Sequence, residues 1–476
     1  MNNMIDVRNP KTGLIDYHIP DMGPDEISIV AAALRDAQLS WSNRTAAERG
    51  AIIGKFADAL EMHQQALSNA LAEDTGRTTF SALEASISVY IARHWSTQCT
   101  IAFEGLASEG VSRQVPTVAY RHLYVPYSVV GIISPWNVPL LLPFLDGMAA
   151  LAAGCSVLLK PSEVTPRFIE PLQRAINDVP AIAKVFHIVT GGPETGGAII
   201  DHVDAICFTG SVATGRKVAQ HAATRFIPAF LELGGKDPAI VMPDANIELA
   251  TRAILRSALG MTGQACQSLE RIYVHEDIYG KFLNEVLTQV DKLTLTCDHK
   301  TGGDIAPLIF SKQVQTIQSQ VDDATAQGAT VLRGGAPLVK GGTWYPPTVI
   351  TEVNHQMKIM REETFGPIIP IMTFSSVDKV IELANDSEFG LSGAVFSDNP
   401  HTCDYIASRI DAGGISINDA SLTGVVNDVE KNSFKLSGMG GSRMGVAGMT
   451  RFLRKRALLR QMAEPADVRI FSEPDS

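Results

Sequence analysis

The feature that most constrains this fold is a regular alternation of apolar strand and helix in the middle of the chain. Each predicted strand is a nearly continuous hydrophobic run, as is typical of parallel strands covered by helices on both faces. The pairs are Val129–Ile133 with Leu140–Ala153, Ser156–Lys160 with Pro166–Asn177, Phe186–Thr190 with Thr195–Asp201, and Ala205–Thr209 with Gly215–Ala223. This pattern predicts an α/β fold with a Rossmann-like, doubly wound sheet of the dinucleotide-binding type.

A second α/β unit follows Gly234-Gly235, beginning with a strand at Pro238–Val241 and a helix at Ile247–Leu259. Because 476 residues are too many for one hydrophobic core, two or more domains are expected. Further helices are predicted at Ile278–Leu293, Phe310–Gln327 and Val377–Asn385, and further strands at Thr330–Arg333, Ile368–Thr373 and Ala394–Phe396.

The two ends of the chain have different patterns. Asp25–Trp41 and Ala46–Leu71 show helical periodicity and predict a helical layer. From Thr117 the pattern changes to β, and two runs over 118–124 and 127–133 are interpreted as a strand pair, an edge hairpin that would contact another subunit. The basic and apolar stretch Phe452–Met462 fits either a solvated tail or a strand that docks on a partner subunit.

Charge and cysteine spacing exclude several classes of function. A net charge of -11 disfavours nucleic acid and anionic membranes as partners. The six cysteines include no C-x-x-C pair and no zinc-like cluster with histidine, so we predict no metal site and a reducing compartment. No signal-peptide pattern is visible, and no apolar run reaches the ~20 residues of a membrane span. A cytoplasmic protein is therefore expected.

Polar residues stand where three predicted strands end, the edge at which open parallel sheets bind ligands. Asn137 lies in a turn stiffened by two prolines, and it either presents its amide to a cleft or satisfies its own backbone. Lys160 and Glu163 suit ribose hydroxyls, with a surface ion pair as the alternative. The stretch from Gly210 to Gly215 predicts a glycine turn and a helix N-terminus that favours a phosphate, although its spacing is not G-x-G-x-x-G.

Other junctions carry residues suited to catalysis. Cys266 lies between a predicted helix and strand, where a thiol can face a cleft, although a free cysteine is more often a small buried hydrophobe. Glu232 stands in an apolar run that should raise its pKa toward that of a general base, unless it is a buried acid paired with Lys236. Glu362 and Glu363 precede a Gly-Pro turn, and one or both could equally be solvated surface charges.

Six short motifs follow one another along the chain. They are Pro135-Trp136-Asn137-x-Pro139, Lys160-Pro161-Ser162-Glu163, Phe208-Thr209-Gly210-Ser211, Glu232-Leu-Gly-Gly-Lys236, Gly263-Gln264-x-Cys266 and Glu363-x-Phe365-Gly366-Pro367. In order and approximate spacing they resemble the NAD(P)-dependent, hydrolytic aldehyde dehydrogenase superfamily, and the likeness covers nearly the whole chain. One such motif is a weak signal, whereas six in order are a strong one.

The resemblance implies a mechanism in which Cys266 attacks the aldehyde as a thiolate to give a thiohemiacetal. Loss of hydride to nicotinamide would leave a thioester on the same sulfur. The Asn137 amide and the Cys266 backbone N–H would hold the oxyanion, a contribution of ~3–4 kcal/mol per donor in comparable sites. Glu232 would then activate the water that hydrolyses the thioester.

The same resemblance implies the cofactor site. The residues expected there are Trp136, Lys160, Ser162 and Glu163 at the adenosine ribose and nearby phosphate, Gly210, Ser211 and Gly215 at the pyrophosphate turn, Glu363 at the nicotinamide ribose, Phe365 against the nicotinamide ring, and Leu233. Because a carboxylate at Glu163 accepts from ribose hydroxyls and repels a 2′-phosphate, NAD is predicted over NADP.

The substrate pocket expected by analogy is mostly apolar, which favours a hydrophobic or aromatic aldehyde. Its residues are Leu140, Leu141, Phe144, Leu145, Ala265, Gln267 and Leu422. No arginine flanks Cys266 closely, so a carboxylate-bearing semialdehyde would need Arg93 or Arg271 as an anchor. The alternatives are a semialdehyde dehydrogenase, hydrolytic or CoA-acylating, and a non-catalytic relative of the fold. Glu232 speaks for hydrolysis, and Cys266 with Asn137 speaks for catalysis.

Two stretches depart from the family pattern. Leu145-Asp146 stands where many relatives have Trp-Lys, which puts the proton relay behind Glu232 in question, and Gly441–Gly445 departs from the usual Arg-Glu continuation. The expected domains are 1–114 with 128–235 for NAD, 236–436 for catalysis, and 115–127 with 437–476 for a small β oligomerisation element and the C-terminal tail. That element predicts a homodimer or homotetramer.

Overall fold

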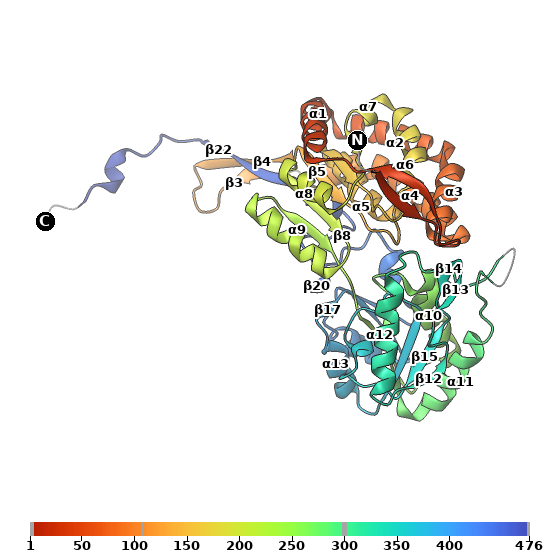
Figure 1. Cartoon of the computed structure of the whole chain (residues 1–476). Helices are drawn as coiled ribbons and strands as arrows, with labels where there is room; N and C mark the ends of the chain where they lie inside the picture. The colour runs from red at the N-terminus through yellow and green to blue at the C-terminus, as the bar shows by residue number, and fades with distance from the viewer. Residues whose placement is uncertain (1–3, 107, 298–301, 474–476) are drawn as a thin grey trace.

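The protein folds around two open sheets, each covered by helices on both faces, with a thin arm that projects away from them (Figure 1). The computed structural model describes residues 4–106, 108–297 and 302–473. A layer of helices at the N-terminal end of the chain packs against the first sheet. Its helices are α1 (Pro24–Ser42), α2 (Ala46–Met62), α3 (Gln64–Thr75) and α4 (Thr78–Leu106).

The first sheet has six strands in the order β21-β9-β8-β5-β6-β7. Its strands are β5 (Val129–Ile133), β6 (Ser156–Lys160), β7 (Phe186–Ile188), β8 (Ala205–Thr209), β9 (Ala229–Glu232) and β21 (Gly438–Met439), and its helices are α5 (Leu141–Ala153), α6 (Ile169–Asn177), α7 (Pro180–Ala183), α8 (Pro193–His202) and α9 (Val212–Thr224). All strands are parallel except β21, which pairs antiparallel with β9. The alternation of strand and helix predicted from the sequence is confirmed.

The second sheet has seven strands in the order β12-β15-β16-β11-β10-β18-β19, and only β12 runs antiparallel to its neighbour. Its strands are β10 (Asp237–Val241), β11 (Leu269–His275), β12 (Thr330–Arg333), β15 (Thr348–Thr351), β16 (Ile368–Phe374), β18 (Ser392–Phe396) and β19 (Gly414–Ile417), and its helices are α10 (Ile247–Leu259), α11 (Tyr279–Val290), α12 (Gln313–Ala326), α13 (Val377–Asn385) and α14 (Pro400–Ala407).

Both sheets place alternate residues in cores on opposite faces, as strands do. In β5, Val130 and Ile132 belong to one buried cluster, whereas Val129 belongs to another across the sheet. In β11, Ile272 and Tyr273 divide between two clusters in the same way. Burial on both faces explains why these strands are continuous apolar runs in the sequence.

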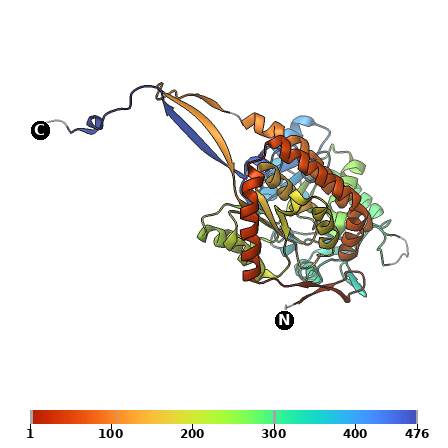
Figure 2. The same ribbon diagram turned by 90° about the horizontal axis from the view of Figure 1, so that it is seen from above.

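The arm consists of β3 (Glu109–Val111), β4 (Val118–Pro126) and β22 (Leu453–Gln461), with β4 in the middle. Figures 1 and 2 both show it extending from the body, with the C-terminal segment continuing past its tip. The predicted pairing of the run at 118–124 with the run at 127–133 is wrong. β4 pairs with β22 and β3, because β5 is enclosed between β6 and β8 in the first sheet.

Several predicted helices have different bounds, and two of these differences are informative. The single helix expected over Ala46–Leu71 is broken at His63 into α2 and α3, a break that continuous apolar periodicity does not reveal. The helix expected from Phe310 begins at Gln313, which leaves Phe310 free to face the cleft. The remaining elements are β1 (Met4–Arg8), β2 (Ile15–Pro20), β13 (Leu338–Lys340), β14 (Gly342–Trp344), β17 (Phe389–Gly390), β20 (Phe434–Lys435) and α15 (Ala447–Thr450), with 3-10 turns η1 (Gly260–Gly263), η2 (Glu276–Ile278), η3 (Lys358–Met360), η4 (Leu422–Gly424) and η5 (Val468–Phe471).

Candidate active site

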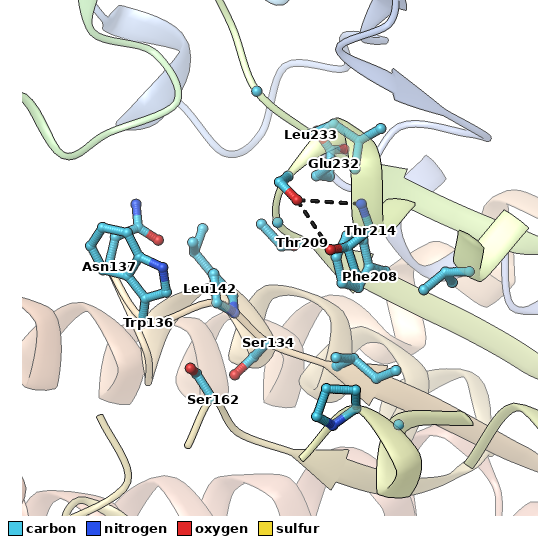
Figure 3. Close-up of a pocket in the computed structure, with 18 of the residues that line it drawn as sticks. Ser134, Trp136, Asn137, Leu142, Ser162, Phe208, Thr209, Thr214, Glu232 and Leu233 are labelled. Carbon is cyan, nitrogen blue, oxygen red and sulfur yellow. Dashed lines mark hydrogen bonds between the residues drawn. The ribbon is translucent and has the colours of Figure 1, made fainter. Parts of the chain in front are cut away.

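A cleft of about 670 Å³ lies where the carboxyl ends of the first sheet's strands face the second sheet. Figure 3 shows Trp136 and Asn137 on one side of this cleft and Glu232 and Leu233 on the other. The structure brings together there most of the residues selected from the sequence for catalysis and cofactor binding. They are Asn137, Glu232 and Cys266, with Trp136, Lys160, Ser162, Glu163, Gly210, Ser211, Leu233, Glu363 and Phe365.

The loop that carries Cys266 is held in an uncommon backbone conformation. Met261, Thr262 and Gly263 all have positive φ angles, of 54°, 61° and 68°. A side chain at Gly263 would collide with the carbonyl oxygen of Gly366, so only glycine fits this position without a shift. Gln264, the second residue of the Gly263-Gln264-x-Cys266 motif, is fully buried, and its side-chain oxygen accepts a hydrogen bond from Ile309 N–H at 2.9 Å. The loop is therefore fixed before it reaches the thiol.

Cys266 lines the cleft and keeps part of its surface exposed. Burial of the sulfur raises the pKa of the thiol to about 12, and the carboxylates of Glu363 and Asp237 add to this effect, whereas Lys431 opposes it. Because an unperturbed thiol titrates near 8.5, the thiol is protonated at neutral pH and needs a base to become a nucleophile.

Asn137 is placed beside the Cys266 loop. Its side chain is 5% exposed, and Nδ2 donates to the backbone oxygen of Gln264 at 3.0 Å. Its own backbone oxygen accepts a hydrogen bond from the buried guanidinium of Arg77. The turn is thus fixed by tertiary contacts, and the amide faces the loop two residues before the sulfur. This arrangement suits an oxyanion donor.

Glu232 ends strand β9, with its carboxylate at the cleft. Ser433 Oγ donates to its Oε2 at 3.0 Å, and β21 pairs with its backbone through Gly438. The alternative in which Glu232 is paired with Lys236 is wrong. The Lys236 ammonium is buried and donates to Glu270 and Thr364, each at 2.8 Å, so it is committed to partners other than Glu232.

The side of the cleft predicted for the adenosine ribose combines a buried cation with a carboxylate. Lys160 Nζ lies 3.4 Å from Glu163 Oε2 and donates to the backbone oxygen of Pro161 at 3.2 Å. Burial lowers the pKa of Lys160, and the charge of Glu163 partly offsets this. The lysine side chain is 5% exposed and that of Glu163 is 38% exposed, so the carboxylate is the group that presents itself to a ligand.

The turn predicted to bind the pyrophosphate is a capped helix N-terminus. Ser211 is the N-cap of α9, and its Oγ accepts from Thr214 N–H at 3.3 Å (Figure 3). Gly215, expected at the pyrophosphate, does not line the cleft. It lets α9 pack against Leu233, whose Cδ2 would lie 2.5 Å from any added Cβ. Its role in the structure is helix packing.

The side of the cleft predicted for the nicotinamide is an aromatic wall with a buried acid. The rings of Trp136 and Phe365 meet edge to face at 5.3 Å, and Phe310 lies 5.9 Å from Trp136. Burial raises the pKa of Glu363 to about 8, helped by the charge of Glu270, while Gly235 N–H donates to it at 3.1 Å. Glu270 also accepts from the backbone N–H of Phe365 at 2.8 Å, which fixes the ring.

Sequence reasoning missed a second helix N-terminus at the cleft. Gly192 and Pro193 begin α8 and line the cleft beside α9. The signal was present, because Gly-Gly-Pro after the strand that ends at residue 188 is the same strand, turn and helix pattern that was recognised at Gly210. Phe310 was missed because it had been assigned to a helix as its first residue, whereas the helix begins at Gln313.

The residues predicted for the substrate pocket agree less well with the structure. Leu140 and Phe144 are fully buried in the core, so their assignment to a pocket is wrong, whereas Leu142 lines the cleft. The other predicted residues, Leu141, Leu145, Ala265, Gln267 and Leu422, lie outside the lining of this cleft. Gln267 Oε1 accepts from Thr423 Oγ1 at 2.8 Å, which joins the Cys266 loop to η4.

Neither arginine proposed as a carboxylate anchor is available. Arg93 is paired with Asp58 and Glu61 on the helical layer. Arg271 is buried and donates to the backbone oxygens of Lys236 and Ala384, each at 2.8 Å. Both guanidinium groups are thus committed to structural contacts.

The two departures from the family pattern meet in space. Asp146 is buried in α5 and forms ion pairs with Arg443, at 2.7 Å, and with Arg451. Arg451 also packs over the rings of Phe230 and Phe452, at 4.9 Å from each centroid. An acid at 146 and basic residues in the C-terminal segment therefore form one buried cluster that ties α5 to the start of the arm.

Within the described ranges, no group of three or more His, Cys, Asp or Glu side chains is arranged to hold a metal ion. No helix in the described part of the chain is long and apolar enough to cross a membrane.

Comparison with known proteins agrees with this site. Residues 1–458 match the aldehyde dehydrogenase family. The structure superimposes on that of "Putative Aldehyde Dehydrogenase PutA" from Anabaena variabilis with a TM-score of 0.95 and 44% identity, covering 98% of this chain and 99% of that one. It superimposes on betaine aldehyde dehydrogenase from Staphylococcus aureus in complex with NAD+ with a TM-score of 0.92 and 30% identity, covering 99% and 94%.

Among curated relatives, a "Putative succinate-semialdehyde dehydrogenase NADP(+)" from Mycolicibacterium smegmatis is 34% identical over 449 residues, which are 92% of this chain and 85% of that protein. The chain belongs to the aldehyde dehydrogenase family. It is an NAD(P)-dependent oxidoreductase that acts on aldehydes, and the resemblance inferred from six motifs is confirmed.

Proposed function

We propose that the protein oxidises an aldehyde to the carboxylic acid through a covalent thioester on Cys266. The observation that carries this proposal is the convergence of Cys266, Asn137 and Glu232 on one cleft. Three different parts of the fold supply them, namely the loop before β11, the turn after β5 and the end of β9.

A dinucleotide fits this cleft on observations independent of the catalytic residues. The N-termini of α8 and α9 both face it, and unpaired N–H groups at helix N-termini favour phosphate oxygens. Trp136 and Phe365 form an apolar wall against which a planar ring can pack. When bound, the nicotinamide would accept the hydride that leaves the substrate carbon.

The chain's own groups would act in sequence around the sulfur. With the thiol pKa at about 12, Cys266 must lose its proton as it attacks, and Glu232 is the carboxylate at the cleft whose protein partner is a neutral hydroxyl. The Asn137 amide would donate to the oxyanion. After losing the thiol proton to solvent, Glu232 would take a proton from the water that attacks the thioester and pass it to the departing sulfur, which releases the acid and restores the thiol.

For the cofactor we propose NAD over NADP, because Glu163 is the exposed carboxylate next to Lys160. Its charge would repel a 2′-phosphate, while its oxygens can accept from ribose hydroxyls. Glu163→Gln should raise kcat/KM for NADP relative to NAD by about 10-fold or more, the size of one charge contact. Wild-type enzyme that uses NADP as well as NAD would contradict the proposal.

Water rather than CoA is proposed as the acyl acceptor, since Glu232 is placed to activate it. Product analysis with CoA supplied would separate the two reactions: free acid is expected, and acyl-CoA as the main product would favour the acylating alternative.

The names of the relatives leave the substrate open. They include proteins named for succinate semialdehyde, which is an anion, and for betaine aldehyde, which is a cation. For this chain we propose an apolar path to the thiol along Leu142, which suits an aldehyde with a hydrophobic or aromatic body.

We also propose that the protein forms a homodimer or homotetramer through the arm. Strand β22 is exposed along nearly all of its length, and its outer edge has no partner strand among the described residues. Light scattering of the intact chain and of a chain ending before Leu453 would test this, with a monomeric intact chain contradicting it. A cytoplasmic location remains our prediction from the cysteine spacing.

A further inference from the structure

Lys431 is a cation near Cys266 that has no charged partner. It is partly buried in the segment between η4 and β20, where its backbone N–H donates to Ser442 Oγ at 3.2 Å. Within the described part of the chain, no carboxylate forms an ion pair with its ammonium and no acceptor forms a hydrogen bond with it.

A short chain of contacts connects this lysine to the residue after Cys266. Its Cδ packs against Gly414, where an added Cβ would lie 3.4 Å away. The methyl group of Thr423 packs against the same glycine, and Thr423 Oγ1 bonds to Gln267, the residue after Cys266. Lys431, Thr423 and Gln267 are therefore connected through contacts that lead to the thiol, and the charge of Lys431 lowers the pKa of Cys266, which favours the thiolate.

Three other basic residues of the fold differ from Lys431 because they are already paired. Lys236 bonds to Glu270, Arg443 bonds to Asp146, and Arg256 bonds to Asp419 at 2.5 Å. A lysine stem can pack against the protein while its ammonium stays free to meet a ligand. The stem of Lys431 packs in this way against Gly414 at the start of β19.

We propose that Lys431 binds an anionic group of the substrate, so that the preferred substrate is an aldehyde that carries a carboxylate several atoms from its carbonyl. An ammonium on a flexible stem can follow a carboxylate without fixed geometry, which suits an anchor at the end of a chain. Leu142 would border the apolar part between the two ends. The inference rests on the proposed oxidation at Cys266.

The test compares three aldehydes that differ in charge, namely succinate semialdehyde, butanal and betaine aldehyde, with NAD held saturating. For the wild-type enzyme, kcat/KM is expected to fall in that order. In Lys431→Met, the ratio of kcat/KM for succinate semialdehyde to that for butanal should fall about 10- to 100-fold, the range of one hydrogen bond to a charged group. The change should lie mainly in KM, and Lys431→Arg should restore most of the ratio.

Lys435→Met is the matched control, because Lys435 lies four residues away and is paired with Asp411 at 2.9 Å. It should leave the ratio unchanged. If Lys431→Met slows all three aldehydes by the same factor, the lysine acts on the thiol or on the loop, and the anchor is disproved. Failure of every aldehyde to yield NADH in the wild type would instead disprove the proposed function, so the two failures are distinguishable.

Discussion

The proposed cofactor side and the proposed substrate side of the cleft are formed by different kinds of structural element. On the cofactor side, side chains stand at the ends of β5, β6 and β8, three strands of one buried sheet. The proposed substrate side lies in one segment after β19, in which Val425 and Val429 are 69% and 62% exposed.

The difference shows which parts of the site tolerate change. The cofactor side depends on close contacts between glycine backbone and side chains. At Gly234, an added Cβ would lie only 2.6 Å from the carboxylate of Glu363. Few sequences satisfy such contacts. The substrate side depends on side chains carried by an exposed segment, which can be exchanged without disturbing either sheet.

The largest effect is expected from Asn137→Ala, because the amide belongs to the chemistry that every substrate shares. Loss of one oxyanion donor should lower kcat by about 10²- to 10³-fold. Steady-state kinetics with a neutral and an anionic aldehyde should show the same loss for both, with NAD affinity unchanged. A loss confined to one aldehyde would show that Asn137 recognises that substrate and does not stabilise the oxyanion that all substrates form.

Gly263→Ala should destabilise the Cys266 loop. The added methyl would meet the Gly366 carbonyl oxygen at a residue with φ of 68°, so the free energy of unfolding should fall by roughly 2–4 kcal/mol. Gly260→Ala is the matched control, because nothing lies within 4 Å of a Cβ there. Chemical denaturation of both variants measures the difference, and equal stability would show that the loop is not constrained as described.

Glu363→Gln should change how stability depends on pH. Since the pKa of Glu363 is raised to about 8 in the folded protein, its protonated form is favoured there, and its contribution is full below about pH 4.5 and lost as pH rises through 8. Without cofactor, the wild type should lose roughly 1–3 kcal/mol more than the variant between pH 5 and 8.5. Parallel pH profiles would contradict the burial of this acid.

The smallest effect is expected from Thr423→Val on the substrate side. Removing the 2.8 Å hydrogen bond to Gln267 costs about 1 kcal/mol, so kcat/KM should fall about 3- to 5-fold. Affinity for NAD should not change, and titration of the cofactor checks this. A large loss of NAD binding would show that the two sides are not independent.

The same division decides what could be predicted from the sequence. Asn137, Cys266 and Gly210 were found because strand ends and glycine turns have local patterns that persist in the fold. Lys431 was missed because its closeness to Cys266 arises only when residues 165 apart in the chain meet across a loop. No local pattern records such a contact.

The pairing of β4 with β22 failed for a similar reason. The two runs that alternate like a hairpin are neighbours in sequence, yet the true partner of β4 begins at Leu453. Asp146 is the opposite case, since the sequence marked both it and the 441–445 stretch as unusual but could not show that they contact each other. A buried charged residue needs a partner of opposite charge, and only the fold shows which residue that partner is.

The central claim is that the aldehyde carbon becomes bound to Cys266 and is released by Glu232. Its most direct test is mass spectrometry of Glu232→Gln, mixed with aldehyde and NAD, then quenched and digested. The peptide containing Cys266 should carry one acyl group, formed together with one equivalent of NADH and released slowly. NADH formation with Cys266 unmodified, or an acyl group on another residue, would contradict the account.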